Sequence, residues 1–187
     1  MRTLVVSEFV SIDGVMEAPG GEPGFPHTNW VGDHRGGNDH FAYKLDEIRE
    51  AESHLLGRVT YESFAGAWPH RSGEFAEKIN AMPKHVVSTT LKNPEWNNSV
   101  VIGGDVLGGI TRLKQSDGGP ILVAGSGKLV HWLVEHDLVD EFRLMIFPIV
   151  LGSGFRMFPE SQRKLELSLA DSRAFKSGVV LQVYRRR

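Results

Sequence analysis

The chain has 187 residues, 41% of them hydrophobic and 24% charged, which is the composition of an ordinary globular protein of one domain, residues 1–187. Its net charge of -2 gives no electrostatic reason to expect a nucleic acid or an anionic membrane as partner. It has no cysteine, no metal-binding spacing among its histidines and no apolar run long enough to span a membrane. We therefore expect a cytoplasmic protein that acts on a small molecule and holds no metal.

The first part of the chain predicts a central strand, a long loop and a helix. Residues 3–10 are predominantly apolar, as in a buried strand. Residues 11–35 are rich in glycine and proline, and loops this long inside a compact domain are usually functional or disordered. Because this loop also carries aromatic residues such as Trp30, we expect it to be a lid. A helix is predicted from about Asp39, a suitable N-cap residue.

The rest of the chain alternates strands with helices. Strands are predicted at 53–57, 85–90, 99–104, 121–124 and 140–151, and helices at 58–66, 75–82, 106–113 and 129–133. Two final segments, 164–175 and 178–186, alternate apolar and polar residues and predict an antiparallel hairpin. This order predicts an α/β fold with helices on both faces of a mostly parallel sheet and an antiparallel C-terminal edge.

A glycine turn joins the apolar strand 121–124 to the helix that follows it. Strand, turn and helix in this order point backbone N–H groups and the positive end of a helix dipole at an anion. Gly125-Ser126-Gly127 matches neither common phosphate fingerprint, because Val130 stands where a third glycine belongs and Leu129 follows Lys128. Taken alone, the turn leaves open whether it binds a ligand.

Small, hydroxylic or basic residues follow several predicted strands, where open α/β sheets bind ligands. These segments are 11–14, 57–62, 88–90, 103–104 and 125–127. Arg58 starts a predicted helix, where the dipole disfavours a cation unless a phosphate lies beside it. Hydroxyl donors of residues 88–90 are expected nearby.

Three motifs in this chain resemble one protein superfamily. "LLGRVTYESF" resembles the G-R-x-T-[WY]-E-S segment of dihydrofolate reductase, and "VSIDGVME" resembles the S-x-D-G segment of the reductase domain in bifunctional riboflavin biosynthesis enzymes. The stretch from Ile121 to Phe158 is similar to that reductase domain over its whole length. The resemblance covers most of the chain and implies a dihydrofolate reductase-like three-layer fold with NADPH as cofactor.

The resemblance also implies which residues would bind that cofactor. They are Gly57, Arg58 and Thr60 on the pyrophosphate and adenosine side, Ser88 and Thr89 by the 2′-phosphate, Gly125, Ser126, Gly127 and Lys128 around the pyrophosphate, and Ile12, Asp13 and Gly14 near the nicotinamide. Thr89 stands where many relatives carry arginine, so 2′-phosphate recognition would depend more on Arg58.

The reduction itself needs few protein side chains, because the cofactor supplies the hydride and the protein positions it and supplies a proton. Asp13, Glu17 and Asp39 are the candidate catalytic carboxyl groups, and Glu17 or Asp39 could relay the proton. Each has a simpler interpretation: Asp13 as part of a turn, Glu17 as a solvated side chain and Asp39 as a helix N-cap.

The resemblance implies an NADPH-dependent reductase of a small heterocyclic or carbonyl substrate. Its narrow form is 5-amino-6-(5-phosphoribosylamino)uracil reductase of riboflavin biosynthesis, although the deaminase domain of the bifunctional enzymes is missing here. Reduction of a pterin or folate is the other form. The alternative is a non-catalytic nucleotide-binding module that kept the fold.

We also expect a homodimer. The predicted strand 140–151 is apolar on both faces, and the closing hairpin can cover only one of them. The resembling reductase domains tend to form twofold dimers, so we expect pairing through the C-terminal strands. The alternative is that the loop 11–35 folds over the second face within one chain.

Overall fold

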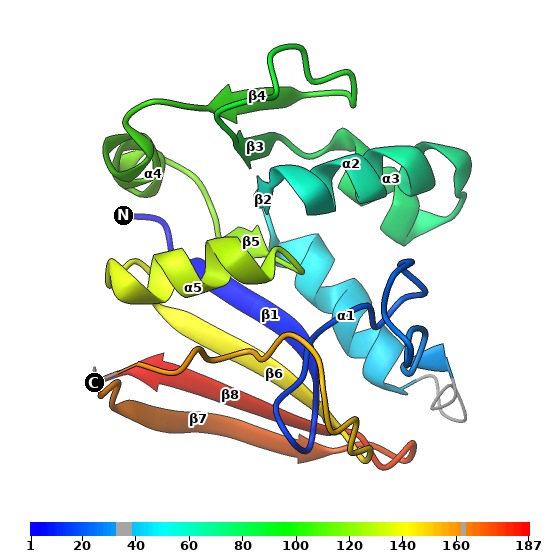
Figure 1. The fold of residues 1–187 in the computed structure, drawn as a ribbon. Coiled ribbons are helices and arrows are strands. Elements are labelled where there is room, and N and C mark those ends of the chain that lie inside the picture. The colour runs from blue at the N-terminus through cyan, green and yellow to red at the C-terminus, as the bar shows by residue number, and fades with distance from the viewer. Residues whose placement is uncertain (33–38, 162–163) are drawn as a thin grey trace.

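A computed structural model describes residues 1–32, 39–161 and 164–187. Its centre is a sheet of eight strands in the order β4-β3-β2-β5-β1-β6-β8-β7 (Figure 1). The strands are β1 (Leu4–Ser11), β2 (Ser53–Gly57), β3 (Lys84–Val87), β4 (Ser99–Ile102), β5 (Ile121–Val123), β6 (Glu141–Phe147), β7 (Leu167–Ala174) and β8 (Val180–Arg186). The pairs from β4 to β6 are parallel, and β8 and β7 add an antiparallel edge, as predicted.

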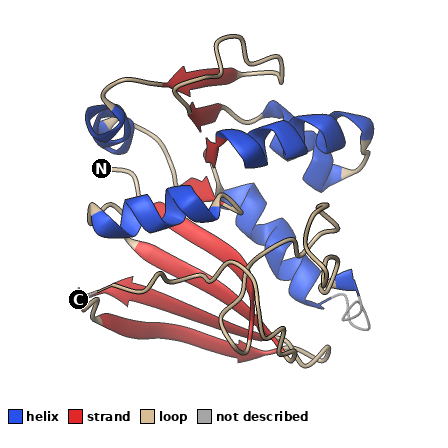
Figure 2. Ribbon diagram, viewed as in Figure 1, coloured by secondary structure: helices blue, strands red, loops and turns tan. Residues whose placement is uncertain are grey.

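The helices follow the predicted alternation with strands (Figure 2). They are α1 (Asp39–Glu50), α2 (Arg58–Ala67), the short 3₁₀ helix η2 (Trp68–His70), α3 (Glu74–Ala81), α4 (Val106–Gln115) and α5 (Gly127–Glu135). Among the residues described, no helix combines the length and apolar character that crossing a membrane requires.

Three of the predicted boundaries were wrong for local reasons. The strand expected over 140–151 ends at Phe147, because Pro148 has no N–H with which to continue the ladder. The helix expected to stop at Gly66 continues to Ala67, because an isolated glycine weakens a helix without ending it. The strand expected over 85–90 also ends early, at Val87, where a turn begins.

Side chains on the two faces of the sheet enter different cores, which gives the three layers. Leu4 and Val6 of β1 pack with the residues of α4 and α5, whereas Val5, between them, packs with those of α1, α2 and α3. This alternation follows from the period of two in a strand. All three side chains are buried, as expected for a parallel strand covered on both faces.

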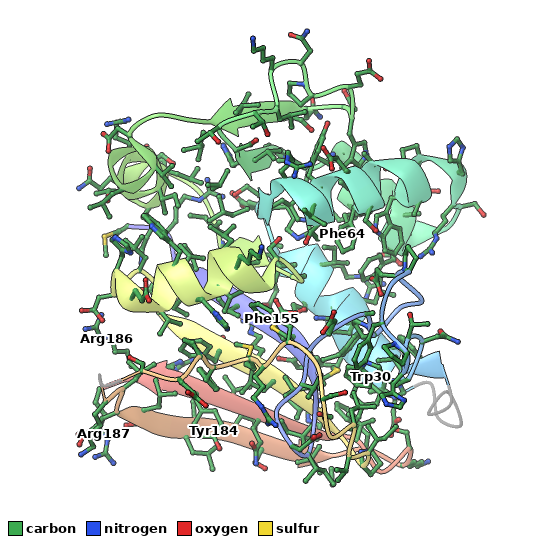
Figure 3. The ribbon with its side chains drawn as sticks, viewed as in Figure 1. Trp30, Phe64, Phe155, Tyr184, Arg186 and Arg187 are labelled. Carbon is green, nitrogen blue, oxygen red and sulfur yellow. The ribbon has the colours of Figure 1, made fainter. Side chains whose placement is uncertain are left out.

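The described part of the long loop covers the second face of β6. Phe25, Trp30 and Val31 are buried there against Met145 and Phe147. Trp30 also donates from Nε1 to the backbone oxygen of Glu17 over 2.8 Å (Figure 3). Up to residue 32 the loop is thus packed over β6. Whether it opens as a lid stays a prediction, and its last predicted residues, 33–35, lie outside the described part.

This packing also removes the first argument for a homodimer. The face of β6 that appeared uncovered in the sequence is covered within one chain, which is the alternative stated above. The homodimer itself stays a prediction and now depends on other surfaces.

Candidate functional site

The carboxyl ends of the parallel strands meet at one edge of the sheet. β5 lies between β2 and β1 and has only three residues, so the turn after it begins while β1 still continues beside β6. The glycine turn is therefore flanked by β1 and by the end of β2. Ligands of open α/β sheets bind in this position.

Three hydrogen bonds hold the turn between β1 and α2. The N–H of Gly125 donates to Oε2 of Glu8 over 2.9 Å, and the N–H of Ser126 donates to Oγ1 of Thr60 over 2.9 Å. Oγ of Ser126 accepts from the N–H of Gly57, also over 2.9 Å. The predicted residues Gly57, Thr60, Gly125 and Ser126 do come together, but the N–H groups and hydroxyls that join them are occupied by one another and by Glu8.

The N–H groups that remain for an anion lie one residue further along. The first backbone hydrogen bond of α5 runs from the N–H of Val130 to the backbone oxygen of Ser126. The N–H groups of Gly127, Lys128 and Leu129 come before it and have no partner inside the helix. No acceptor for them is found in the part of the chain that the structure describes. The positive end of the helix dipole and the exposed side chain of Lys128 would also attract an anion to this position.

Arg58 already has a partner. It is the first residue of α2, and its Nη1 donates to both carboxylate oxygens of Glu62, over 2.9 and 2.8 Å. Both side chains are exposed, and they lie four residues apart on one helix. Because Glu62 stabilises Arg58 within the chain, the position of this arginine at a helix start does not by itself indicate a phosphate, and its role toward one stays a prediction.

Ser88 has a structural role at the end of β3. Its Oγ accepts from the N–H of Thr90 over 3.1 Å and from that of Leu91 over 2.9 Å, which turns the chain. Its side chain is buried, whereas Thr89 is exposed at this edge. Of these two predicted residues, Thr89 presents the more accessible hydroxyl group.

The turn formed by residues 11–14 is fixed by Asp13. Its carboxylate accepts from Oγ of Ser11 over 2.7 Å and from the N–H groups of Leu151 and Gly152 over 3.1 and 2.7 Å. These bonds, led by that of Ser11, lower the pKa of Asp13 to about 2. Asp13 is therefore ionised at neutral pH and unsuited to donate a proton. Ile12 points outward, 62% exposed, and Gly14 has a φ of 83°.

Glu17 and Asp39 likewise accept hydrogen bonds from the backbone. Oε2 of Glu17 accepts from the N–H of Phe155 over 2.7 Å. Oδ2 of Asp39 accepts from the N–H of Lys176 over 2.8 Å, a bond that lowers the pKa of Asp39. Asp39 thereby joins α1 to the hairpin of β7 and β8. All three predicted carboxyl groups hold segments of the chain together.

A fourth carboxyl group, Glu8, was missed. It lies in β1 with 6% of its surface exposed, and burial raises its pKa well above the ordinary value. Its Oε2 binds the glycine turn, and its Oε1 is buried without a hydrogen-bond partner among the residues described. The signal was present in the sequence, because a glutamate inside the apolar run Leu4–Val10 is unusual.

With this geometry established, comparison with known proteins identifies the family. Residues 2–181 match the family described as the RibD C-terminal domain, and the chain belongs to it. The uncharacterized protein YyaP of Bacillus subtilis (strain 168) is 30% identical over 189 residues, covering 98% of this chain and 94% of YyaP.

Solved structures share the fold. A putative riboflavin biosynthesis protein from Shewanella sp. PV-4 superposes with a TM-score of 0.76 at 20% identity, covering 100% of this chain and 99% of the other. A pyrimidine reductase-like protein from Corynebacterium diphtheriae superposes with a TM-score of 0.67 at 13% identity, covering 100% and 92%. The predicted dihydrofolate reductase-like α/β fold is thus confirmed.

Proposed function

We propose that the protein is an NADPH-dependent reductase of a small heterocyclic or carbonyl compound, of the class that includes 5-amino-6-(5-phosphoribosylamino)uracil. The observation that carries this proposal is the start of α5, where three N–H groups without acceptors among the described residues lie on a turn clamped between β1 and α2. The pyrophosphate of a dinucleotide fits such a group of donors. Membership of the RibD C-terminal domain family supports the same assignment.

The residues fit the two phosphate sites of NADPH unequally. Gly127, Lys128 and Leu129 would hold the pyrophosphate with backbone N–H groups. Arg58 and Thr89 are the candidates for the 2′-phosphate, and Arg58 must first release Glu62. An exposed ion pair of this kind contributes less than about 1 kcal/mol, whereas a hydrogen bond to a charged group contributes about 1.5–3 kcal/mol. A phosphate can therefore displace Glu62.

When bound, NADPH would supply the hydride, and the chain would position the reactants and exclude water. Through its bonds to Leu151 and Gly152, Asp13 would hold the turn formed by residues 11–14, which the resemblance assigns to the nicotinamide end. Glu17 would hold the backbone at Phe155 in the same way. These two carboxylates act as positioning groups in this proposal.

A non-catalytic nucleotide-binding module is the second candidate. The observation in its favour is that the three candidate catalytic carboxyl groups, Asp13, Glu17 and Asp39, all accept backbone hydrogen bonds, as groups with a purely structural role would. Such a module would bind NADPH but would not transfer its hydride to any substrate.

One variant pair tests the phosphate site. Lys128→Glu places a negative charge at the start of α5, which favours the helix but repels a phosphate. We expect NADPH affinity, measured by fluorescence titration, to fall roughly tenfold or more, with no loss of thermal stability. Lys164→Glu makes the same charge change at a residue whose side chain is 81% exposed, and should leave affinity unchanged.

The same preparation should be screened for NADPH oxidation with dihydrofolate, pterins and the ribosylaminouracil intermediate. Turnover on any of them supports the reductase, and binding without turnover favours the module. Absence of NADPH binding by the unmodified protein, or equal affinities of the two lysine variants, would contradict the proposed site.

A further inference from the structure

Glu8 places a carboxyl group where the sheet otherwise buries apolar side chains. On the same face of β1 its neighbours are Val6 and Val10, which are both in the core. In the neighbouring strand β6, the residue paired with Glu8 is Leu144. Burying a carboxyl group here is far less favourable than burying another valine. A buried carboxyl group in a central strand therefore indicates a functional role rather than a contribution to stability.

The two oxygens of this carboxyl group differ. Oε2 accepts from the N–H of Gly125, whereas Oε1 is buried and has no hydrogen-bond partner in the described ranges. Buried polar atoms are nearly always hydrogen-bonded in native proteins, so an unpartnered one points to a ligand or water that completes it. Oε1 is therefore an independent indication of a ligand beside the glycine turn.

Its position agrees with that of the phosphate site. Val6 pairs with Val123, the last residue of β5, and Glu8 lies two residues further along β1, where β5 has given way to the turn. A single hydrogen bond connects it to Gly125, two residues before Gly127, where the N–H groups at the start of α5 begin. Oε1 and those N–H groups thus flank the same turn.

Burial favours the protonated form of the Glu8 carboxyl group. Burial is the largest influence on the pKa of Glu8 and raises it; the N–H of Gly125 and Lys44 lower it, and Glu47 raises it. Lys44 and Glu47, both from α1, are the charged groups acting on it, while β6 adjoins it with Leu144 and the turn with a backbone N–H. In this form Glu8 can accept from the N–H of Gly125 at one oxygen and donate a hydrogen bond from the other, the unpartnered Oε1.

We infer that Glu8 is a ligand-binding residue of this site, whose Oε1 donates a hydrogen bond to the carboxamide oxygen of the nicotinamide. The inference rests on the proposed function. Glu8 lies on β1, on the opposite side of the turn from Arg58 and Thr89, the groups proposed for the adenosine end, so it faces the nicotinamide end. An amide oxygen is a neutral acceptor, which suits a neutral acid as donor.

Two substitutions and two probes test this assignment. Glu8→Gln keeps an acceptor for Gly125 and a donor for the ligand, whereas Glu8→Leu removes both. The probes are NADPH and 2′-phospho-ADP-ribose, which lacks the nicotinamide ring. We expect Glu8→Leu to lose roughly tenfold in NADPH affinity relative to its affinity for 2′-phospho-ADP-ribose, and Glu8→Gln to bind both like the unmodified protein.

A pH series provides a readout that needs only the unmodified protein and Glu8→Gln, should Glu8→Leu fail to fold. NADPH affinity of the unmodified protein should fall toward alkaline pH, because deprotonation removes the donor and adds a negative charge. That of Glu8→Gln should lack this part of the pH dependence.

Equal weakening of both probes by Glu8→Leu would mean that Glu8 acts only by holding the turn, and would overturn the inference. Identical pH profiles for the unmodified protein and Glu8→Gln would do the same. Both results leave the proposed function intact. Failure of the unmodified protein to bind either probe at any pH would instead reject the proposed function, and the role of Glu8 with it.

Discussion

Phe155 packs its ring directly onto Gly127, the first residue of α5. A β-carbon at Gly127 would lie 2.5 Å from Cε1 of Phe155, closer than real contacts allow. Figure 3 shows Phe155 beside the start of α5, in the segment that follows β6. The glycine at this position therefore permits close packing between the helix that offers N–H groups and the loop that Glu17 holds.

Gly127→Ala should destabilise the protein by about 1–3 kcal/mol, because the ring must move out of a packed position. Urea unfolding measures the change in the free energy of unfolding. Gly66→Ala is the control, since no atom lies within 4 Å of a β-carbon at that site in α2. There the better helix propensity of alanine should stabilise by about 0.5–1 kcal/mol. If both substitutions stabilise the protein, the ring of Phe155 can move aside without cost, and the close packing on Gly127 does not contribute to stability.

Acid should destabilise the protein through His54. This side chain is buried in β2 beside Phe64, and neither ring nitrogen has a hydrogen-bond partner among the residues described. Burial, with a smaller effect of Lys84, lowers the pKa of His54 to about 3. The unfolded chain takes up a proton near its ordinary pKa of about 6.5, so this stability is present above pH 6.5 and is lost as pH falls toward 3.

The measurement is the free energy of unfolding between pH 7 and pH 4, where His54 should contribute a slope of up to about 1.4 kcal/mol per pH unit. His54→Leu should reduce the slope by that amount. His70→Leu, at an exposed position, serves as the control. An unchanged slope in His54→Leu would assign the acid sensitivity to other groups.

Arg58→Ala should weaken NADPH binding by about 1.5–3 kcal/mol, as expected for the loss of a hydrogen bond to a charged phosphate. Glu62→Ala is the informative companion, because it frees Arg58 from its ion pair and should leave affinity equal or improved. NADH, which lacks the 2′-phosphate, should bind more weakly than NADPH and respond little to either change. Equal NADPH affinity in Arg58→Ala would remove this residue from the site.

We propose that the protein is a homodimer through its C-terminal strands. Within the described ranges β7 pairs only with β8, and its residue Leu169 is 58% exposed. The irregular register between Leu169 and Asp171 works against pairing edge to edge, so we expect contact through the exposed face of β7. Sedimentation at micromolar concentration should give twice the mass of one chain, which is 20.8 kDa. Leu169→Lys should shift the mass to that of one chain, and a single 20.8 kDa species before mutation would contradict the dimer.

The sequence by itself determined the order of the elements, the parallel sheet with its antiparallel edge, and the segments that meet at the carboxyl edge. Each depends on local information: the period of apolar residues, the glycines at turns and the length of each segment. The pairing of Arg58 with Glu62 could also have been predicted from the sequence, because a spacing of four residues places both side chains on one face of a helix.

Only the tertiary structure decided which polar groups are already occupied. Glu8 and Gly125 are 117 residues apart, and Asp13 and Leu151 are 138 apart, so no periodicity could pair them. The same holds for Trp30, which the fold buries over β6 instead of leaving it in a mobile loop. Whether a carboxyl group is an ionised anchor, like Asp13, or a buried acid, like Glu8, depends on desolvation and on donors from distant segments, which arise only when the chain is folded.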